Sequence, residues 1–265
     1  MTGALLRVDA AVCRWLEEQG TPLVLGLCGS QGSGKSTLAA RLADRMQARG
    51  VATAILSLDD LYLPGAVRAD LAARIHPLLR TRGVPLTHDV ARGAAVIDAI
   101  RTRQPTALPR FDKAHDEPAA DTATVADIDL LIFEGWCVGA VPQDEVALLE
   151  PVNVLEREED PAAIWRRAVN TALATDYAAL FARIDRLVLL AAPGFDVVTG
   201  WRTEQEETLR RRVAATGGDA SALMDAAAIA RFVQHYERLT RHILAEMPGR
   251  ADLTLRLDPD RRVLA

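Results

Sequence analysis

The pattern of hydrophobic and polar positions along the chain predicts helices that alternate with buried strands. Apolar residues at helical spacing or a helical composition predict helices over about residues 4–18, 35–48, 89–103, 199–213 and 225–247. Short, continuous apolar runs predict buried strands over about residues 23–27, 52–58, 128–133, 186–191 and 253–257. The pair Asp160-Pro161 is typical of a helix N-cap followed by proline, and it predicts a further helix towards residue 184 with a break near Thr175.

This alternation predicts an α/β fold in three layers, with a mostly parallel central sheet and helices on both faces. Two irregular segments that contain prolines, at about 63–88 and 104–127, interrupt the order. Segments of this length without regular structure are unusual inside a compact domain and are often functional. We therefore expect both to be insertions at one edge of the sheet. No segment has the composition of a linker, so residues 1–265 are expected to form one domain.

Composition and charge exclude several classes of protein. The chain is 49% hydrophobic and 25% charged, as in ordinary globular proteins, and its net charge of −5 argues against nucleic-acid binding. No apolar run approaches the roughly 20 residues that span a bilayer, and the N-terminal segment has the pattern of an amphipathic helix, so we expect no membrane contact and no signal peptide. Three separated cysteines favour reduced thiols in a cytoplasm. The oligomeric state stays open.

The segment LVLGLCGSQGSGKSTLAARLADRM contains the phosphate-binding pattern Gly-x-x-x-x-Gly-Lys-Ser between a predicted strand and a predicted helix. The glycines allow backbone N–H groups to surround phosphate oxygens, and the helix N-terminus adds partial positive charge. Lys35 is expected to reach the β- and γ-phosphates of ATP, and Ser36 to bind Mg²⁺. The predicted nucleotide site consists of Gly29, Ser30, Gln31, Gly32, Ser33, Gly34, Lys35, Ser36 and Thr37.

Carboxylates follow two further strands. Asp59 and Asp60 come after the strand at 52–58, and Glu134 comes after the strand at 128–133. Because the carboxyl ends of parallel strands share one edge, these acids are expected around the phosphate site. Glu134 has the position of a Walker B acid and is assigned to Mg²⁺ with Ser36, and Asp59 is the second carboxylate within reach of the metal.

One aspartate of the pair is then expected to accept the proton of an attacking hydroxyl, and we assign this role to Asp59. The alternative is that one of them, Asp59 or Asp60, only caps the following turn. Ras-type GTPases read guanine through Asn-Lys-x-Asp, but neither lysine of this chain follows an asparagine. Ile132 also stands where the aspartate of a GTPase switch would be, so small-molecule phosphoryl transfer is favoured. ATP is expected, although no base-reading motif separates it from GTP.

The chain resembles the D-glycerate 3-kinase group of P-loop kinases, a superfamily that also includes uridine kinase, pantothenate kinase and phosphoribulokinase. The resemblance spans about residues 23–257 and rests on SLDDLYLP, RIHPLLRTRGVPLTHD, FDKAHDE, LLIFEGW and GWRTEQEETLR. It implies an ATP-dependent kinase of D-glycerate or a similar small hydroxy acid. It also implies that Asp59 is the base, that Ser36 and Glu134 bind the metal, and that Lys35 binds phosphate.

A small anionic acceptor requires cations and hydroxyl readers in the loops at this edge. We predict a substrate site built from Asp60, Tyr62, Arg82, His88, Asp89, Lys113 and Trp136. Lys113 is notable because only two of the 31 Lys and Arg residues are lysines, which suggests a position where the planar arginine fork would not fit. Plainer alternatives are a helix cap for Asp89, core packing for Trp136 and no function for His88.

A kinase must exclude water, so a closing segment is expected. We predict a lid at about residues 194–213, in which Arg202 stabilises the transferring phosphoryl group. The alternative is a solvated helix with charge pairs four residues apart. Two other functions stay open: a kinase of a nucleoside or pantothenate, and a nucleotide-binding regulator or chaperone that would not need Asp59.

Overall fold

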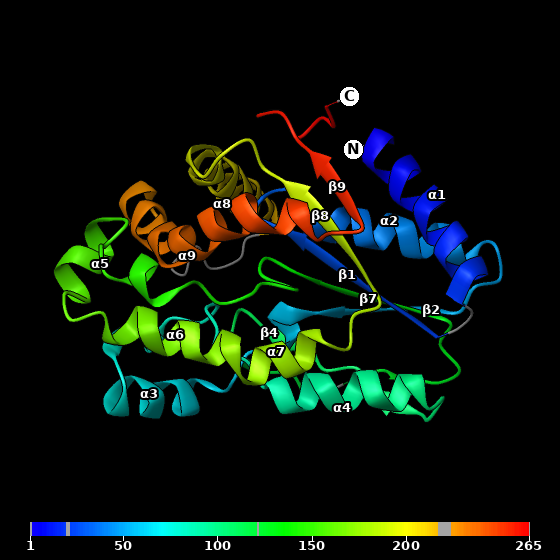
Figure 1. Ribbon diagram of the computed structural model, residues 1–265, viewed down its shortest axis with the longest axis horizontal. Helices are drawn as coiled ribbons and strands as arrows, with labels where there is room; N and C mark the ends of the chain where they lie inside the picture. Colours follow the sequence, from blue (N-terminus) through cyan, green and yellow to red (C-terminus); the bar gives the residue numbers. More distant parts are fainter. Residues whose placement is uncertain (1, 20–21, 121, 217–223, 265) are drawn as a thin grey trace.

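The protein is described by a computed structural model over residues 2–19, 22–120, 122–216 and 224–264, and it is built on a five-stranded sheet (Figure 1). The strands lie in the order β2-β7-β1-β8-β9, and every neighbouring pair is parallel. This confirms the predicted α/β fold. The strand bounds are β1 (Leu23–Gly29), β2 (Thr53–Ser57), β7 (Leu130–Gly135), β8 (Arg186–Ala191) and β9 (Leu253–Arg256).

Helices cover both faces of the sheet. Leu25 and Leu27 of β1 pack against one layer, and Val24 and Cys28 pack against the other. Because both faces of the central strand are buried, its sequence is a continuous apolar run. The first layer holds α1 (Thr2–Gln19), α2 (Lys35–Gln47) and part of α8 (Asp196–Thr216); the second holds α4 (Val90–Arg101), α6 (Ile164–Ala174), α7 (Asp176–Phe181) and α9 (Ala226–Glu246).

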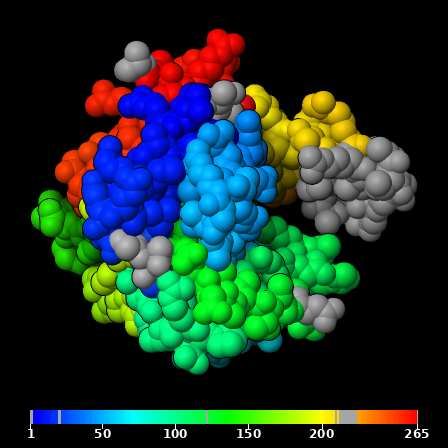
Figure 2. Space-filling view, turned by 90° about the vertical axis from the view of Figure 1, so that its right-hand side faces the viewer, coloured from blue at the N-terminus to red at the C-terminus, as the bar shows by residue number. Residues whose placement is uncertain are grey.

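Helices α1 and α2 lie side by side on one surface of the molecule (Figure 2). Asp9 of α1 accepts hydrogen bonds from Arg45 at 2.9 Å and from Arg49 at 2.6 Å, and these bonds tie the first helix to the one that follows the phosphate-binding loop. Within the described residues, no helix combines the length and the hydropathy needed to cross a membrane.

The predicted helix that begins at Asp160 is shorter and divided. It forms as α6 and α7, separated at Thr175 as expected, but α6 begins at Ile164. The carboxylate of Asp160 still accepts from the N–H groups of Trp165 and Arg166, at 2.9 and 3.1 Å. Asp160 therefore pairs with free N–H groups of the first helical turn although it lies before the helix, because residues 161–163 form an extra turn between them.

The two segments expected to be irregular contain short regular elements. The first holds α3 (Gly65–Arg74) and a 3₁₀ turn (Pro77–Arg80), and the second holds two small antiparallel pairs. These pairs are β3 (Thr106–Ala107) with β6 (Thr124–Val125) and β4 (Phe111–Asp112) with β5 (Glu117–Pro118). The remaining elements, also not predicted, are α5 (Val154–Glu159) and 3₁₀ turns at Leu58–Leu61, Glu145–Leu148 and Met247–Gly249.

Candidate active site

The phosphate-binding loop connects β1 to α2 and contains polar groups that lack partners. Gly32 and Gly34 have φ angles of +75° and +88°, a region that glycine adopts without strain. The Oγ atoms of Ser30 and Ser33 and Oε1 of Gln31 are buried without a hydrogen-bond partner among the described residues. Buried polar atoms are normally paired, and of these atoms the two serine hydroxyls can donate hydrogen bonds to a ligand. A phosphate group fits this loop because its oxygens accept hydrogen bonds from hydroxyl and N–H groups.

A cavity of about 300 Å³ opens in front of the loop at the carboxyl edge of the sheet. Its walls come from the loop itself, from the turns after β2 and β7, from both insertions, and from helices α8 and α9. The residues that line it are Gln31, Gly32, Lys35, Ser36, Asp59, Tyr62, Arg82, Lys113, Trp136, Arg202, Gln205, Phe232 and Tyr236. Asp59 is the carboxylate in this set, which also contains four cationic side chains.

Asp59 is held between two groups in the cavity. Its Oδ2 accepts from the Lys113 ammonium at 2.6 Å, and its Oδ1 accepts from the Tyr62 hydroxyl at 2.6 Å. Burial raises the pKa of Asp59, but Lys113 and Lys35 together with the hydrogen bond from Tyr62 outweigh it and lower the pKa to about 2. The carboxylate is therefore ionised and able to accept a proton.

Asp60 is not among the residues that line the cavity, and its predicted contact with the acceptor stays a prediction. Its carboxylate accepts from the backbone N–H of Phe111 at 3.1 Å and from Arg110 at 3.0 Å. Asp60 therefore anchors the β4–β5 pair, and that pair carries Lys113 to Asp59. The two neighbouring aspartates thus have different partners, and Asp60 holds the second insertion and does not cap the turn that follows it.

Two of the three predicted metal residues, Ser36 and Glu134, are in direct contact. Ser36 donates from Oγ to Oε1 of Glu134 at 3.0 Å. Glu134 is buried, and its Oε2 has no hydrogen-bond partner among the described residues. A buried carboxylate oxygen without a partner is costly unless a cation binds it. This pair therefore fits a divalent cation, whereas Asp59 is already occupied by Lys113 and Tyr62.

Arg82 and Trp136 lie together in the wall of the cavity. The Trp136 indole donates to the carbonyl of Gly83 at 2.7 Å, and the Tyr236 hydroxyl donates to the carbonyl of Arg82 at 2.9 Å. The Arg82 guanidinium lies over the Tyr62 ring, with 5.9 Å to its centroid, and forms an ion pair with Asp116. The backbone and side chain of Arg82 are therefore both fixed before any ligand binds.

His88 and Asp89 are not among the residues that line this cavity, and their predicted contact with the acceptor stays a prediction. Asp89 accepts from the N–H of Arg92 at 3.0 Å and is the N-cap of α4, the plainer of its two alternatives. His88 lies behind Tyr62, with 5.0 Å between the ring centroids, and its Nδ1 is 2.6 Å from the Tyr177 hydroxyl. Burial lowers the pKa of His88 to about 4, so its ring is neutral at neutral pH.

Arg202 reaches the cavity from α8. Its side chain forms an ion pair with Glu206 at 2.7 Å, and its guanidinium carbon lies 5.7 Å from the centroid of the Phe232 ring. Only 17% of the side chain is exposed, so a solvated charge pair does not describe it. A lid function for this segment stays a prediction. Gln205, Phe232 and Tyr236 were not predicted as site residues, because helical spacing identifies a buried stripe without showing which part of it faces a cavity.

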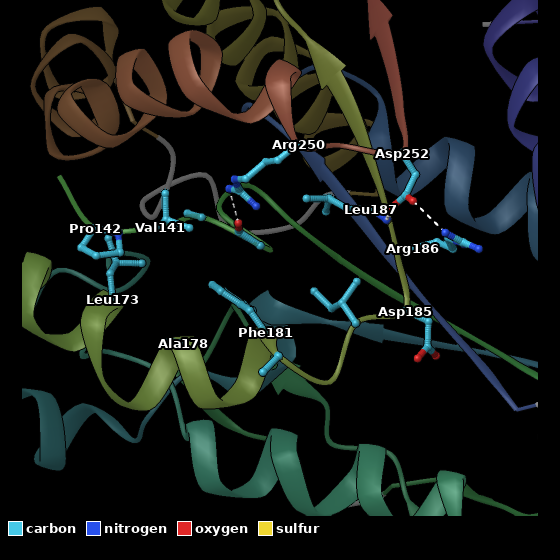
Figure 3. Close-up of a pocket in the computed structure, with 14 residues that line it drawn as sticks. Val141, Pro142, Leu173, Ala178, Phe181, Asp185, Arg186, Leu187, Arg250 and Asp252 are labelled. Carbon is cyan, nitrogen blue, oxygen red and sulfur yellow. Dashed lines mark hydrogen bonds and ion pairs between the residues drawn. The ribbon is translucent and has the colours of Figure 1, made fainter.

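A second cavity, of about 360 Å³, lies at the opposite edge of the sheet, where β8 begins (Figure 3). Its charged side chains face partners of their own. Arg186 pairs with Asp252 at 3.1 Å, and Arg250 donates to the carbonyl of Gly139 at 2.5 Å. Asp185 accepts from the N–H of Val24 at 2.8 Å. Because these charged side chains already have partners within the protein and the phosphate loop lies at the other edge, this cavity is not the candidate site.

Comparisons with known proteins show which proteins this chain resembles. A family model described as "Nephrocystin 3, N-terminal" matches residues 1–61. The "Uncharacterized kinase mug58" of Schizosaccharomyces pombe is 33% identical over 242 residues, which are 85% of this chain and 83% of that protein. The chloroplastic D-glycerate 3-kinase of Arabidopsis thaliana is 27% identical over 259 residues, 92% of this chain, but the match spans only 52% of that longer protein.

Among solved structures, a D-glycerate 3-kinase from Cryptococcus neoformans var. grubii has a TM-score of 0.82 at 23% identity, with 99% of this chain and 98% of that chain covered. At this identity the likeness shows the fold. The extended match to the fission-yeast kinase shows that the chain is a kinase relative over most of its length. The chain belongs to the D-glycerate 3-kinase-like family of P-loop kinases.

Proposed function

We propose that the protein is an ATP-dependent kinase that transfers the γ-phosphoryl group of Mg-ATP to a hydroxyl of D-glycerate or a similar small hydroxy acid. The observation that carries this proposal is the ionised carboxylate of Asp59 in the phosphate-loop cavity. A carboxylate repels the phosphates of a nucleotide, so an ionised Asp59 in this cavity would weaken nucleotide binding unless it takes part in the reaction. Accepting the proton of the attacking hydroxyl is such a role.

The nucleotide side of the cavity supports Mg-ATP. Lys35 would contact the β- and γ-phosphates, and the unpaired hydroxyls of Ser30 and Ser33 are available to phosphate oxygens. Ser36 and Glu134 would hold Mg²⁺, which neutralises charge on the phosphates when it is bound. No group of three or more His, Cys, Asp or Glu side chains suited to a metal occurs in the described part of the chain. ATP oxygens and water would therefore complete the coordination.

In the proposed reaction, the hydroxyl oxygen of the acceptor forms a bond to the γ-phosphorus. The bond from that phosphorus to the oxygen bridging the β- and γ-phosphates breaks, ADP leaves, and the hydroxyl proton passes to Asp59. The hydrogen bond from Tyr62 keeps the Asp59 carboxylate oriented for this transfer. Arg202, which lines the cavity, would stabilise charge on the transferring group.

The cations on the acceptor side support an anionic acceptor. Arg82 and Lys113 line the cavity in addition to Lys35 and Arg202. The Lys113 ammonium donates to Oδ2 of Asp59 at 2.6 Å. For an attacking hydroxyl to reach this oxygen, Lys113 must move and pair with another anion. A carboxylate on the acceptor provides that anion, with Arg82 as a second contact. The name of the Arabidopsis relative, a D-glycerate 3-kinase, agrees with such an acceptor.

Two observations favour a second candidate, a kinase of a nucleoside or pantothenate. Tyr62, Trp136, Phe232 and Tyr236 bring four aromatic rings to the cavity, and aromatic rings stack on bases. A pantothenate kinase of Agrobacterium fabrum is 31% identical over 144 residues, although these are only 39% of that protein.

The three free cysteines, Cys13, Cys28 and Cys137, agree with a cytoplasmic location, which we also propose.

The test is ADP release by the purified protein with Mg-ATP and single acceptors: D-glycerate, L-glycerate, glycerol, uridine, cytidine and pantothenate. Stimulation by D-glycerate is expected, and glycerol is the neutral control for the carboxylate. Stimulation by uridine, cytidine or pantothenate instead would establish the second candidate. If no acceptor stimulates release while Mg-ATP still binds, the kinase proposal fails in favour of a nucleotide-binding regulator.

A further inference from the structure

The C-terminal turn at residues 258–262 contacts the phosphate-binding loop from 229 positions away in the sequence. Arg261 donates from Nε to the carbonyl oxygen of Gly32 at 2.6 Å. A terminal nitrogen of the same guanidinium donates to Glu204 of α8 at 2.6 Å, and the guanidinium carbon lies 5.0 Å from the centroid of the Trp201 ring. One side chain therefore joins the phosphate loop to the helix that carries Arg202.

Helix α8 packs on the phosphate loop at the same point. A Cβ atom built on Gly32 would lie 2.5 Å from Cβ of Trp201, so only glycine permits this close approach. Trp201 is buried, and its indole N–H donates to the carbonyl of Pro259 at 2.7 Å. The turn consequently holds α8 through Trp201 and Glu204, and it holds the loop through Gly32.

The turn itself is shaped to present Arg261. The φ angle of Arg261 is +64°, a left-handed conformation that is uncommon for a residue with a side chain. Asp258 donates from its N–H to the carbonyl of Arg262 at 2.8 Å, and its carboxylate accepts from the N–H of Arg262 at 2.7 Å. Such a conformation persists where surrounding contacts fix it. The direction of the Arg261 side chain is therefore set by the backbone of the turn.

These contacts determine the spacing between two walls of the active site. Gly32 lines the cavity from the loop, and Arg202, which directly follows Trp201, lines it from α8. The peptide unit is planar, so fixing the carbonyl of Gly32 also fixes the N–H of Ser33, which donates across the loop to the carbonyl of Ser30 at 3.2 Å. We infer that Arg261 is a positioning residue, which fixes the phosphate loop against the segment of α8 that carries Arg202.

This inference rests on the proposed function only in taking the phosphate loop as a nucleotide site; it is independent of the acceptor. Arg262 offers a matched control, because it is the adjacent arginine of the same turn. Its side chain is 77% exposed and lies 3.8 Å from the exposed Asp260. Arg262→Ala removes the same charge as Arg261→Ala, but the Arg262 side chain forms no hydrogen bond or ion pair with the described residues of the loop or of α8.

The experiment measures the dissociation constant of Mg-ATP by calorimetry, without an acceptor, for the wild type, Arg261→Ala, Arg262→Ala and Arg261→Lys. Arg261→Ala is expected to weaken binding about tenfold, the lower end of what the loss of a charge-assisted hydrogen bond costs. Arg262→Ala should bind like the wild type. Arg261→Lys should fall between them, because one ammonium can reach Gly32 but cannot also bridge to Glu204 and stack on Trp201.

Thermal unfolding of each variant separates positioning from stability. If Arg261→Ala binds Mg-ATP as tightly as Arg262→Ala, the inference is wrong, whatever the unfolding midpoint. If Arg261→Ala does not fold, Glu204→Gln tests the same contact, since Glu204 is 64% exposed and tolerates substitution. It should weaken Mg-ATP binding roughly two- to threefold, and unchanged affinity would overturn the inference. If no acceptor stimulates ADP release but the variants keep this order of affinities for Mg-ATP, only the kinase proposal is rejected.

Discussion

His88 provides a test of the site architecture through the dependence of stability on pH. The ring is 4% exposed, its Nε2 has no partner among the described residues, and burial lowers its pKa from 6.5 to about 4. In the unfolded chain the histidine takes up a proton as the pH falls through about 6.5, but in the folded chain it does so only near 4. The stability is therefore complete above about pH 6.5 and is lost as the pH falls from there towards 4.

The size of this effect follows from the pKa difference of His88, from 6.5 to about 4. At about 1.4 kcal/mol for each pKa unit, the full loss is roughly 3 kcal/mol, of which about 2 kcal/mol is lost between pH 7.5 and pH 5. His235 is also buried, and its pKa is also lowered to about 4, so it contributes a loss of the same sign. The informative quantity is therefore the difference between the wild type and His88→Gln, whose amide can still bond to Tyr177.

Urea unfolding followed by tryptophan fluorescence at pH 7.5 and pH 5 measures this difference. The wild type is expected to lose about 2 kcal/mol more than His88→Gln between the two conditions. His115→Gln is the control, because His115 is exposed and its hydrogen bond to Asp112 raises its pKa. That variant should lose at least as much stability as the wild type on acidification. Equal losses in the wild type and His88→Gln would refute a buried, neutral His88.

Three further predictions concern the chemistry. Asp59→Asn should lower kcat by roughly 10²- to 10⁴-fold with little change in Mg-ATP affinity, as measured by ADP release and calorimetry, because only the proton acceptor is lost; full turnover would exclude Asp59 as the base. Glu134→Gln should raise the Mg²⁺ concentration for half-maximal rate about tenfold, and an unchanged magnesium titration would contradict the metal assignment. Lys113→Met should lower kcat/KM for D-glycerate by about 10- to 100-fold, with His115→Gln as the neighbouring control; an equal loss with a neutral acceptor would argue against a carboxylate contact.

The central sheet and the phosphate loop could be predicted because their signals are local. The strand β8 has the predicted bounds, 186–191, since a strand buried on both faces is a continuous apolar run. The glycine spacing around Lys35 encodes the loop in the same local way. The β4 and β5 strands have two residues each, and contacts with Asp60, some fifty positions earlier, position them. No periodicity exists in so short a strand, so the sequence could not reveal it.

The residues that line the cavity were predicted only in part, for a related reason. Tyr62 and His88 are both near the edge of the sheet, but they pair as an isolated antiparallel bridge, and the histidine ring stacks behind the tyrosine ring. Which of two neighbouring rings faces the cavity depends on this packing. Arg261 also lay outside the prediction, because it reaches Gly32 through the fold of the last turn and belongs to no motif.

The adjacent carboxylates of Asp59 and Asp60 connect the fold of the second insertion to the chemistry. They lie on the 3₁₀ turn Leu58–Leu61, where successive side chains point about 120° apart. One therefore faces the phosphate cavity, and the other holds the backbone of Phe111 and the side chain of Arg110. Lys113 lies in the turn between β4 and β5 and donates to Asp59, the proposed base. Asp60 therefore anchors the segment that carries the partner of Asp59. The acceptor side of the site is thus assembled from β2 outward, while β1 independently supplies the nucleotide side.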